Sequence, residues 1–236
     1  MKRPAFYASP GSVPRDLLAL LHPPYTAWNL AHVVAGAALA PQVDALILTG
    51  TLLAFFFGLG IGAHALDELH GRPLGTSLSR PVLVGLGVGG MVVALVLAVA
   101  GMRIVSPWVL AWAVLGIALA AGYAFEVPRP LHTPLGFALA WGAFPVLVGF
   151  WAQTRTIGLA AVLMAAAMTL LSLAQRALST PARKLRRTVE RAELTMQSGS
   201  VRETWDEDQI LDTWERPLKL LATAVVVLAL ALLLAK

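Results

Sequence analysis

The chain has 236 residues, of which 58% are hydrophobic and only 13% are charged. A soluble domain of ordinary composition has about 25% charged residues, so the composition excludes that class and indicates a membrane protein. The absence of cysteine excludes disulfide bonds and thiolate metal sites. The formal net charge is +5, but most basic residues stand between apolar runs, where they set membrane topology, so we expect no nucleic-acid partner.

The chain begins with a mixed, proline-bearing lead, residues 1–24, in which we expect a short interfacial helix over 16–21. Seven apolar runs follow, each near the roughly 20 residues that cross a bilayer as a helix. We therefore predict an all-α fold, a polytopic membrane helical bundle of about seven transmembrane helices. The predicted spans cover residues 25–40, 43–66, 82–100, 104–125, 134–153, 157–178 and 218–234.

The basic residues predict the orientation. If the N-terminus is cytoplasmic, the cytoplasmic segments are residues 1–24, 67–81, 126–133 and 176–219. They hold fifteen of the eighteen lysines and arginines, and only Arg103, Arg155 and Lys236 lie outside. This asymmetry favours a cytoplasmic N-terminus and a cytoplasmic large loop. We expect an integral protein of a prokaryotic cytoplasmic membrane, in contact with membrane lipids.

The long connection, residues 179–216, has two halves of opposite charge. Its basic half is expected to attract anionic lipid, through Arg183, Lys184, Arg186, Arg187 and Arg191. The half over 201–215 is predicted to be an acidic interfacial helix with Trp205 and Trp214 as anchors. Asp208 and Asp212 share one face of that helix, which is either a solvated charged face or a metal site.

Four ionisable side chains, His64, Asp67, Glu68 and His70, stand where the second apolar run ends. Helical spacing puts the first three on roughly one face. A charge in mid-bilayer costs about 2.5 to 3.5 kcal/mol, so such a cluster is either a functional site or a polar helix end that meets water. In the same run, Gly58, Gly60 and Gly62 form a strip that predicts the close approach of another helix, and glycines over 85–90 predict the same.

Three further features have the order found in a known family. Residues 22–28 (His-Pro-Pro-Tyr-Thr-Ala-Trp) open the first span, and Asp67 is followed by Gly-Arg-Pro-Leu over 71–74. Tyr123 is followed by Pro-Leu-Gly over 134–136 and a span rich in glycine and alanine. This order, from residue 21 to about 175, resembles the UbiA superfamily of intramembrane prenyltransferases, and makes 25–178 a six-helix UbiA-like region followed by a loop, 179–216, and a final span, 217–236.

The resemblance implies a Mg²⁺ cofactor that bridges protein carboxylates to the diphosphate of a prenyl diphosphate. The implied metal ligands are Asp67, Glu68, His64, Asp208 and Asp212. The same resemblance implies Asp67 and Glu68 as catalytic residues, and Arg72 and Asn29 as ligands of the diphosphate. The implied activity is transfer or cyclisation of a prenyl group.

The sequence departs from the family in three ways. Only Asp67 is in register with the family's first aspartate motif, and no carboxylate occurs over 172–179, where the second motif is expected. The chain also has fewer spans. The alternative is therefore a non-catalytic membrane subunit, or a lipid- or pigment-binding scaffold with partners in a membrane complex. A haem or transition-metal site built from histidines is a further alternative, although lone histidines are more often structural. Its candidates are His64 and His70, with His22, His32 and His132 from other spans.

Overall fold

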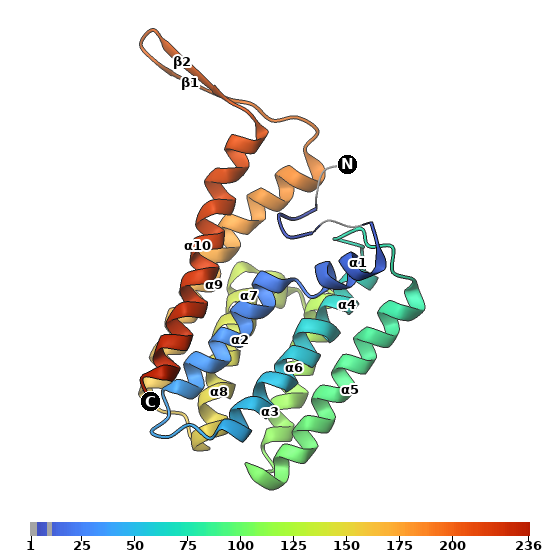
Figure 1. Ribbon diagram of the computed structural model, residues 1–236, viewed down its shortest axis with the longest axis vertical. Helices are drawn as coiled ribbons and strands as arrows, with labels where there is room; N and C mark the ends of the chain where they lie inside the picture. The colour runs from blue at the N-terminus through green and yellow to red at the C-terminus, as the bar shows by residue number, and fades with distance from the viewer. Residues whose placement is uncertain (1–3, 9–10) are drawn as a thin grey trace.

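The computed structural model describes residues 4–8 and 11–236 and is mainly helical (Figure 1). The elements in chain order are α1 (Val13–Leu20), α2 (Pro23–Ala38), α3 (Ala45–Phe55), the π-helix η1 (Phe56–Ala63), α4 (His64–Leu69), α5 (Arg80–Ile104), α6 (Val109–Ala124), the 3-10 helix η2 (Arg129–His132), α7 (Pro134–Ala138), the π-helix η3 (Leu139–Ala143), α8 (Phe144–Thr154), α9 (Leu159–Thr188), β1 (Leu194–Ser198), β2 (Val201–Trp205) and α10 (Glu207–Leu234). The all-α class is confirmed, apart from one short hairpin.

Five helical segments are long and apolar enough to cross a membrane: Ala45–Leu69, Arg80–Ile104, Pro134–Thr154, Leu159–Thr188 and Glu207–Leu234. The protein is therefore an integral membrane protein. α2 and α6 have 16 residues each, and a helix of that length is about 24 Å long, short of the roughly 30 Å hydrocarbon core. Both lie alongside the longer helices in Figure 1, but the predicted total of seven spans is not confirmed.

α2 lies in the middle of the bundle and packs against α8 and α10. Glycines allow the closest of these approaches: a Cβ atom on Gly36 would lie 2.1 Å from the carbonyl oxygen of Val146, and one on Gly149 would lie 2.2 Å from that of Val33. Any larger residue would force the two backbones apart. The main hydrophobic core forms around this contact, with Val33 and Val146 fully buried and the residues around them buried or partly buried.

The predicted close packing of the glycine strip is confirmed for η1 and α5. A Cβ atom on Gly90 would lie 2.8 Å from the backbone nitrogen of Gly62, and one on Gly60 would lie 3.0 Å from the side chain of Thr26 in α2. η1 is thus held between α2 and α5. Its position matters because it leads directly into α4, which carries the ionisable residues His64, Asp67 and Glu68.

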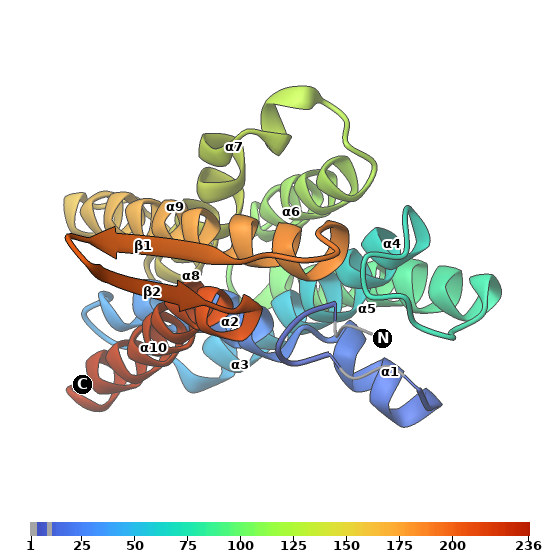
Figure 2. The same ribbon diagram turned by 90° about the horizontal axis from the view of Figure 1, so that it is seen from above.

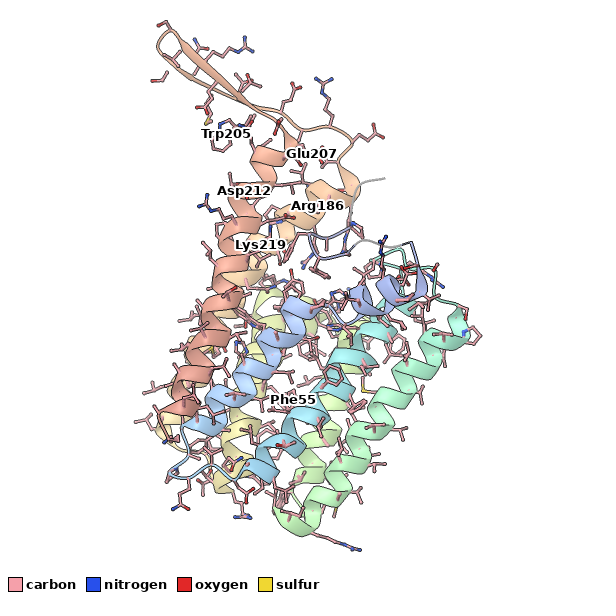
Figure 3. The ribbon with its side chains drawn as sticks, viewed as in Figure 1. Phe55, Arg186, Trp205, Glu207, Asp212 and Lys219 are labelled. Atoms are coloured by element: carbon pink, nitrogen blue, oxygen red, sulfur yellow. The ribbon has the colours of Figure 1, made fainter. Side chains whose placement is uncertain are left out.

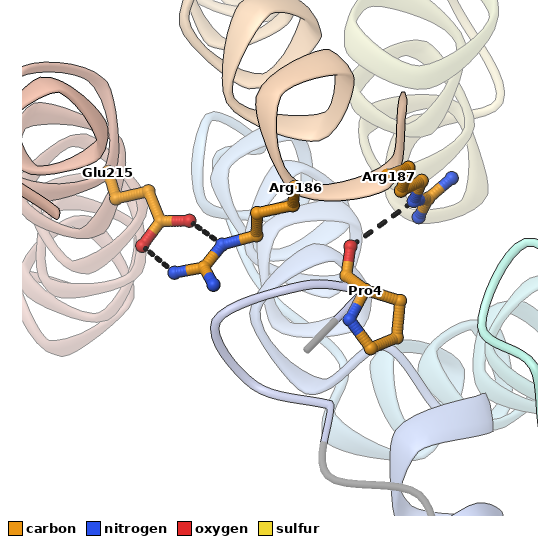
Figure 4. A network of polar contacts seen from close by, with 4 residues as sticks. All are labelled: Pro4, Arg186, Arg187 and Glu215. Carbon is orange, nitrogen blue, oxygen red and sulfur yellow. Dashed lines mark hydrogen bonds and ion pairs between the residues drawn. The ribbon is translucent and has the colours of Figure 1, made fainter. Parts of the chain in front are cut away.

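α9 and α10 form an antiparallel pair that continues past the bundle and ends in the β1–β2 hairpin (Figures 1 and 2). Arg186 and Glu215 join the two helices through a bidentate ion pair (Figure 4). The predicted interfacial helix over 201–215 is wrong in its first part, which is strand β2. A turn at Gly199 with φ of 60° reverses the chain, and an Asp206–Gln209 capping box then starts a helix that runs without a break into the last span.

Candidate functional site

The loop that follows α4 is organised by Glu68, whose side chain has no exposed surface. One carboxylate oxygen accepts a hydrogen bond from the backbone of Leu74 at 2.9 Å. The other accepts bonds from the Thr76 backbone N–H at 2.8 Å and from the Thr76 hydroxyl at 2.9 Å. Because both oxygens are committed to the loop, Glu68 is a structural residue at this position.

Arg72 also binds its own loop. Its backbone has a left-handed conformation with φ of 52°, and one guanidinium nitrogen donates to the carbonyl oxygens of Thr76 at 2.9 Å and Leu78 at 2.8 Å. Arg72, which the resemblance implies as a residue that binds the diphosphate, therefore uses much of its hydrogen-bonding capacity within the loop.

The same loop is joined to α1 by Asp16, which is fully buried. Its carboxylate accepts hydrogen bonds from the backbone and hydroxyl of Ser77 and from the backbone of Gly11. Burial alone raises the pKa of Asp16, but these hydrogen bonds favour the charged form and outweigh burial, so the pKa lies below its usual range. α1 and the loop are thereby held together by an ionised carboxylate.

A different group of polar residues lies where the N-terminal segment, the start of α2, α4 and the C-terminal half of α9 come together. We call it the polar cluster. Its members, drawn from the N-terminal segment and these helices, are Tyr7, His22, Tyr25, Asn29, His64, Asp67, Gln175, Ser179, Arg183 and Arg187.

The N-terminal part of the polar cluster is a stack of rings. The Tyr7 hydroxyl bonds Nδ1 of His22 at 2.6 Å, and the rings of His22 and His64 stack with centroids 4.3 Å apart. Tyr25 packs edge-on against Tyr7 at 5.8 Å. His64 is oriented by a contact of 3.1 Å between its Nδ1 and the carbonyl oxygen of Gly60 in η1, so the π-helical turn fixes one ring of the cluster.

The other side of the polar cluster comes from one face of α9. Tyr25 interacts with the side chains of Gln175 and Ser179. About one and two turns after Ser179, Arg183 and Arg187 interact electrostatically with Asp67. The same two arginines act on His22. Positive charge from α9 therefore faces the single carboxylate that α4 contributes.

Several buried polar atoms at this end have no hydrogen-bond partner among the described residues, namely His22 Nε2, Asn29 Oδ1, Gln175 Oε1 and, one turn earlier in α9, Ser172 Oγ. Roughly 90% or more of buried polar groups in proteins have a partner. Such a concentration indicates a place where a polar ligand or water completes the bonding. Burial lowers the pKa of His22 well below its usual value, so its ring is neutral at pH 7.

Arg176 differs from its neighbours on α9. Its guanidinium donates to the Tyr123 hydroxyl at 3.1 Å and to the His132 carbonyl oxygen at 2.9 Å, and it stands over the Phe137 ring. This arginine therefore joins α9 to the α6–α7 connection and is not available to a ligand in the way that Arg183 and Arg187 are.

An apolar cavity of about 360 Å³ lies deeper in the bundle, between α3, η1, α5, α6 and α8. Aromatic side chains of Trp112, Phe144 and Trp151 form part of its wall. Leu59 of η1 lines the cavity. His64 of the polar cluster follows five residues later in the same continuous helical segment, a rise of about 8 Å along its axis. The cavity and the polar cluster are thus neighbouring levels of one bundle.

The structure brings three of the predicted site residues, Asn29, His64 and Asp67, into the polar cluster, and leaves the others out. Glu68 and Arg72 belong to the loop. Asp208 and Asp212 lie at the start of α10 and line a surface groove with Glu203 and Trp205 of β2. They belong to the part of the chain that continues past the bundle, the ends of α9 and α10 with the β1–β2 hairpin, which we call the arm; Asp212 is labelled there in Figure 3.

The five predicted metal ligands are therefore not assembled. Over residues 4–8 and 11–236 no group of three or more histidine, cysteine, aspartate and glutamate side chains is arranged to hold a metal ion. The polar cluster offers one carboxylate, Asp67, where Mg²⁺ prefers several hard oxygen ligands. The residues present do not fit the magnesium site that the resemblance implies.

The sequence prediction missed the contribution of α9. Ser172, Gln175, Ser179 and Arg183 follow one another at intervals of three or four residues, so they share a face of one helix. That polar stripe within an apolar run was a signal for a buried site.

No family model matches the sequence, no curated protein is similar to it, and no solved structure matches the fold. The class that the fold and the site define is a polytopic helical membrane protein with a partly buried polar cluster at one end and an apolar cavity beside it. The resemblance to the prenyltransferases rests on the sequence motifs.

Proposed function

We propose that this protein binds a prenyl diphosphate in the membrane, with the diphosphate at the polar cluster and the prenyl chain in the apolar cavity. The observation that carries the proposal is the pairing of the two regions. Polar atoms without partners lie at one level of the bundle, and a cavity lined almost wholly by apolar side chains lies at the next. An amphiphile with a compact polar head and a long apolar tail matches both.

We further propose that the polar cluster faces the cytoplasm and that α2 and α6 cross the membrane with the five longer segments, which makes seven spans. α1 and the C-terminal end of α10 lie at opposite ends of the bundle (Figure 1), as an odd number of spans requires. The basic residues of the arm support a cytoplasmic position for the end of the bundle that carries α1 and the polar cluster.

Prenyl transfer or cyclisation is the reaction that this binding serves. Departure of a diphosphate places negative charge near the head group, and Arg183 and Arg187 are positioned to stabilise it. The apolar walls of the cavity would exclude water from the allylic cation that remains. Magnesium would supply further charge stabilisation, but Glu68 is committed to the loop, so in this proposal the stabilising charge comes from the two arginines.

A second candidate is a binding scaffold without chemistry. It is favoured by the composition of α9, where Gln175 and Ser179 stand in place of the carboxylates of the family's second motif. The two candidates share the ligand and differ in whether the bond between prenyl carbon and diphosphate oxygen is broken. Release of pyrophosphate from a bound prenyl diphosphate, measured with an acceptor hydroquinone or phenol present, separates them.

The test of the proposal is binding of geranylgeranyl diphosphate to the purified protein in discs of zwitterionic lipid. Ala113 lines the cavity, whereas Val114, the next residue, is 54% exposed on the outer face of α6. We expect Ala113→Phe to reduce affinity at least 10-fold and Val114→Phe to leave it unchanged. No binding of any prenyl diphosphate by the wild type, with or without Mg²⁺, overturns the proposal.

A further inference from the structure

We infer that the polar cluster is a metal-independent site for a phosphate-bearing head group, in which the guanidinium groups of Arg183 and Arg187 bind the phosphate oxygens directly. The inference rests on the proposed function, because it specifies how the head group of that ligand is held. It also differs from what the family resemblance implies, since guanidinium groups replace the metal ion.

Arg183 and Arg187 are four residues apart in α9 and therefore point to the same side of the helix. Among the described contacts, Arg187 uses only Nε, which donates to the carbonyl oxygen of Pro4 at 3.2 Å (Figure 4). Arg183 makes two long hydrogen bonds within its own helix, to the hydroxyls of Ser179 at 3.2 Å and Thr180 at 3.4 Å. Each guanidinium has five N–H donors, so most of them remain for a ligand.

His22 supplies a neutral donor beside these charges. Burial raises the pKa of Tyr7, so its hydroxyl keeps its proton and can donate to Nδ1 of His22. The neutral imidazole then carries its own proton on Nε2, the atom that is buried without a partner. A phosphate oxygen that bonds this N–H removes an unsatisfied buried donor, which is a gain in free energy specific to the bound state.

Asp67 is the residue that decides between a metal-dependent and a metal-independent site. With no ligand bound, its carboxylate lies within the electrostatic reach of Arg187 and Arg183. If the arginines bind the phosphate directly, Asp67 competes with the ligand for them, and removing its charge strengthens binding. If a metal ion bridges Asp67 to the phosphate, removing its charge abolishes binding instead.

The experiment measures binding of geranylgeranyl diphosphate in EDTA and in Mg²⁺, with the full-length protein in zwitterionic discs. We expect the wild type to bind in EDTA and Asp67→Asn to bind about 3- to 10-fold more tightly. Arg183→Ala and Arg187→Ala should each weaken binding about 10- to 100-fold. Lys184→Ala removes the same charge from the same stretch of α9, at a position that is not among the charges acting on Asp67 and His22, and should change the affinity less than about 2-fold.

Two controls keep the result decisive. Thermal unfolding of each variant separates lost binding from lost folding, and Arg187→Lys, which retains the charge without the fork of donors, should bind with intermediate affinity.

Inorganic pyrophosphate and discs that contain phosphatidylglycerol are used as competitors to identify the source of the phosphate. Competition by both supports direct phosphate binding. Competition by the anionic lipid alone supports the arginine site but assigns it to a lipid head group.

The failures of the two proposals are distinguishable. Binding that requires Mg²⁺ and is lost in Asp67→Asn overturns the metal-independent site and leaves the proposed function standing. Unchanged affinity in both arginine variants, with the variants folded, also overturns the site. Absence of binding in EDTA and in Mg²⁺ overturns the proposed function itself.

Discussion

The loop around Glu68 and the polar cluster beside Asp67 begin at adjacent residues of α4 and have opposite properties. In the loop, both carboxylate oxygens of Glu68 accept hydrogen bonds and Arg72 bonds two backbone carbonyls. In the polar cluster, buried atoms of His22, Asn29 and Gln175 lack partners among the described residues. A polar group whose bonds are completed by the fold stabilises it, whereas one left incomplete is available to a ligand.

This difference shows that neighbouring carboxylates in a sequence motif need not share a role. The motif alone favours a pair of metal ligands at Asp67 and Glu68. The helical geometry separates them by about 100° around the axis of α4, so that one faces the loop and the other faces α9. The following predictions test this contrast.

The largest expected effect is on the loop. Glu68→Gln replaces one acceptor oxygen by an amide that faces N–H donors, which leaves buried donors unsatisfied. We expect the free energy of unfolding to fall by about 2 to 4 kcal/mol. The matched control is Asp67→Asn, the same chemical change one residue earlier, which we expect to change stability by less than about 1 kcal/mol. Denaturant unfolding in detergent measures both, and equal losses would contradict the contrast.

Arg72→Ala should have the next largest effect. It removes two hydrogen bonds to the carbonyl oxygens of Thr76 and Leu78, and we expect a loss of about 1 to 3 kcal/mol in the free energy of unfolding. Binding of a prenyl diphosphate to the folded variant should change little, because the guanidinium is engaged in the loop. A loss of binding at unchanged stability would instead support Arg72 as a residue that binds the diphosphate.

The stability that Asp16 contributes by joining α1 to the loop should depend on pH. The pKa of Asp16 is below its usual range in the folded state, because hydrogen bonds from Ser77 and Gly11 outweigh the opposite effect of burial. Its contribution is therefore complete above the unfolded pKa, near 3.9, and is lost as the pH falls through the folded pKa. We expect the free energy of unfolding of the wild type to exceed that of Asp16→Asn by about 1 to 2 kcal/mol at pH 6 and this difference to shrink towards pH 3, as measured by melting curves. A gap that is the same at every pH would contradict the role of ionised Asp16.

The smallest effect is expected in the polar stripe of α9. Ser172 is fully buried and its hydroxyl lacks a partner among the described residues. Ser172→Ala removes that unsatisfied group with almost no change in volume, so stability should stay within about 0.5 kcal/mol of wild type or rise. Ser179→Ala is the comparison, because Ser179 accepts a bond from Arg183. A loss above about 1 kcal/mol in Ser172→Ala would reveal a bond that the hydroxyl makes in the native protein.

Much of the fold could be predicted from the sequence. The apolar runs predicted the helices because a helix that crosses a membrane must satisfy its own backbone and present apolar side chains along its whole length. The glycines of η1 and α5 predicted close helix contacts for a similar reason, since only small residues allow two backbones to approach. Both features are local, and so a window of about 20 residues contains them.

The arm was predicted less well. Residues 201–205 form strand β2 because they pair with 194–198 across the turn at Gly199, a partner that charge patterning did not suggest. The rest of the acidic segment continues into α10 because its capping box and its apolar run form one helix. The prediction failed where an element depends on a neighbour in space.

The sequence by itself determined the membrane class, the positions of the helices and the presence of ionisable residues at the end of α4. Tertiary structure decided what each of those residues does. Glu68 and Arg72 are closed into a loop, and Asp67 meets Arg183 and Arg187 from a helix more than 100 residues away in the chain. The physical reason is that a side chain's role follows from which of its bonds the folded chain completes, and those partners come together only when distant helices pack.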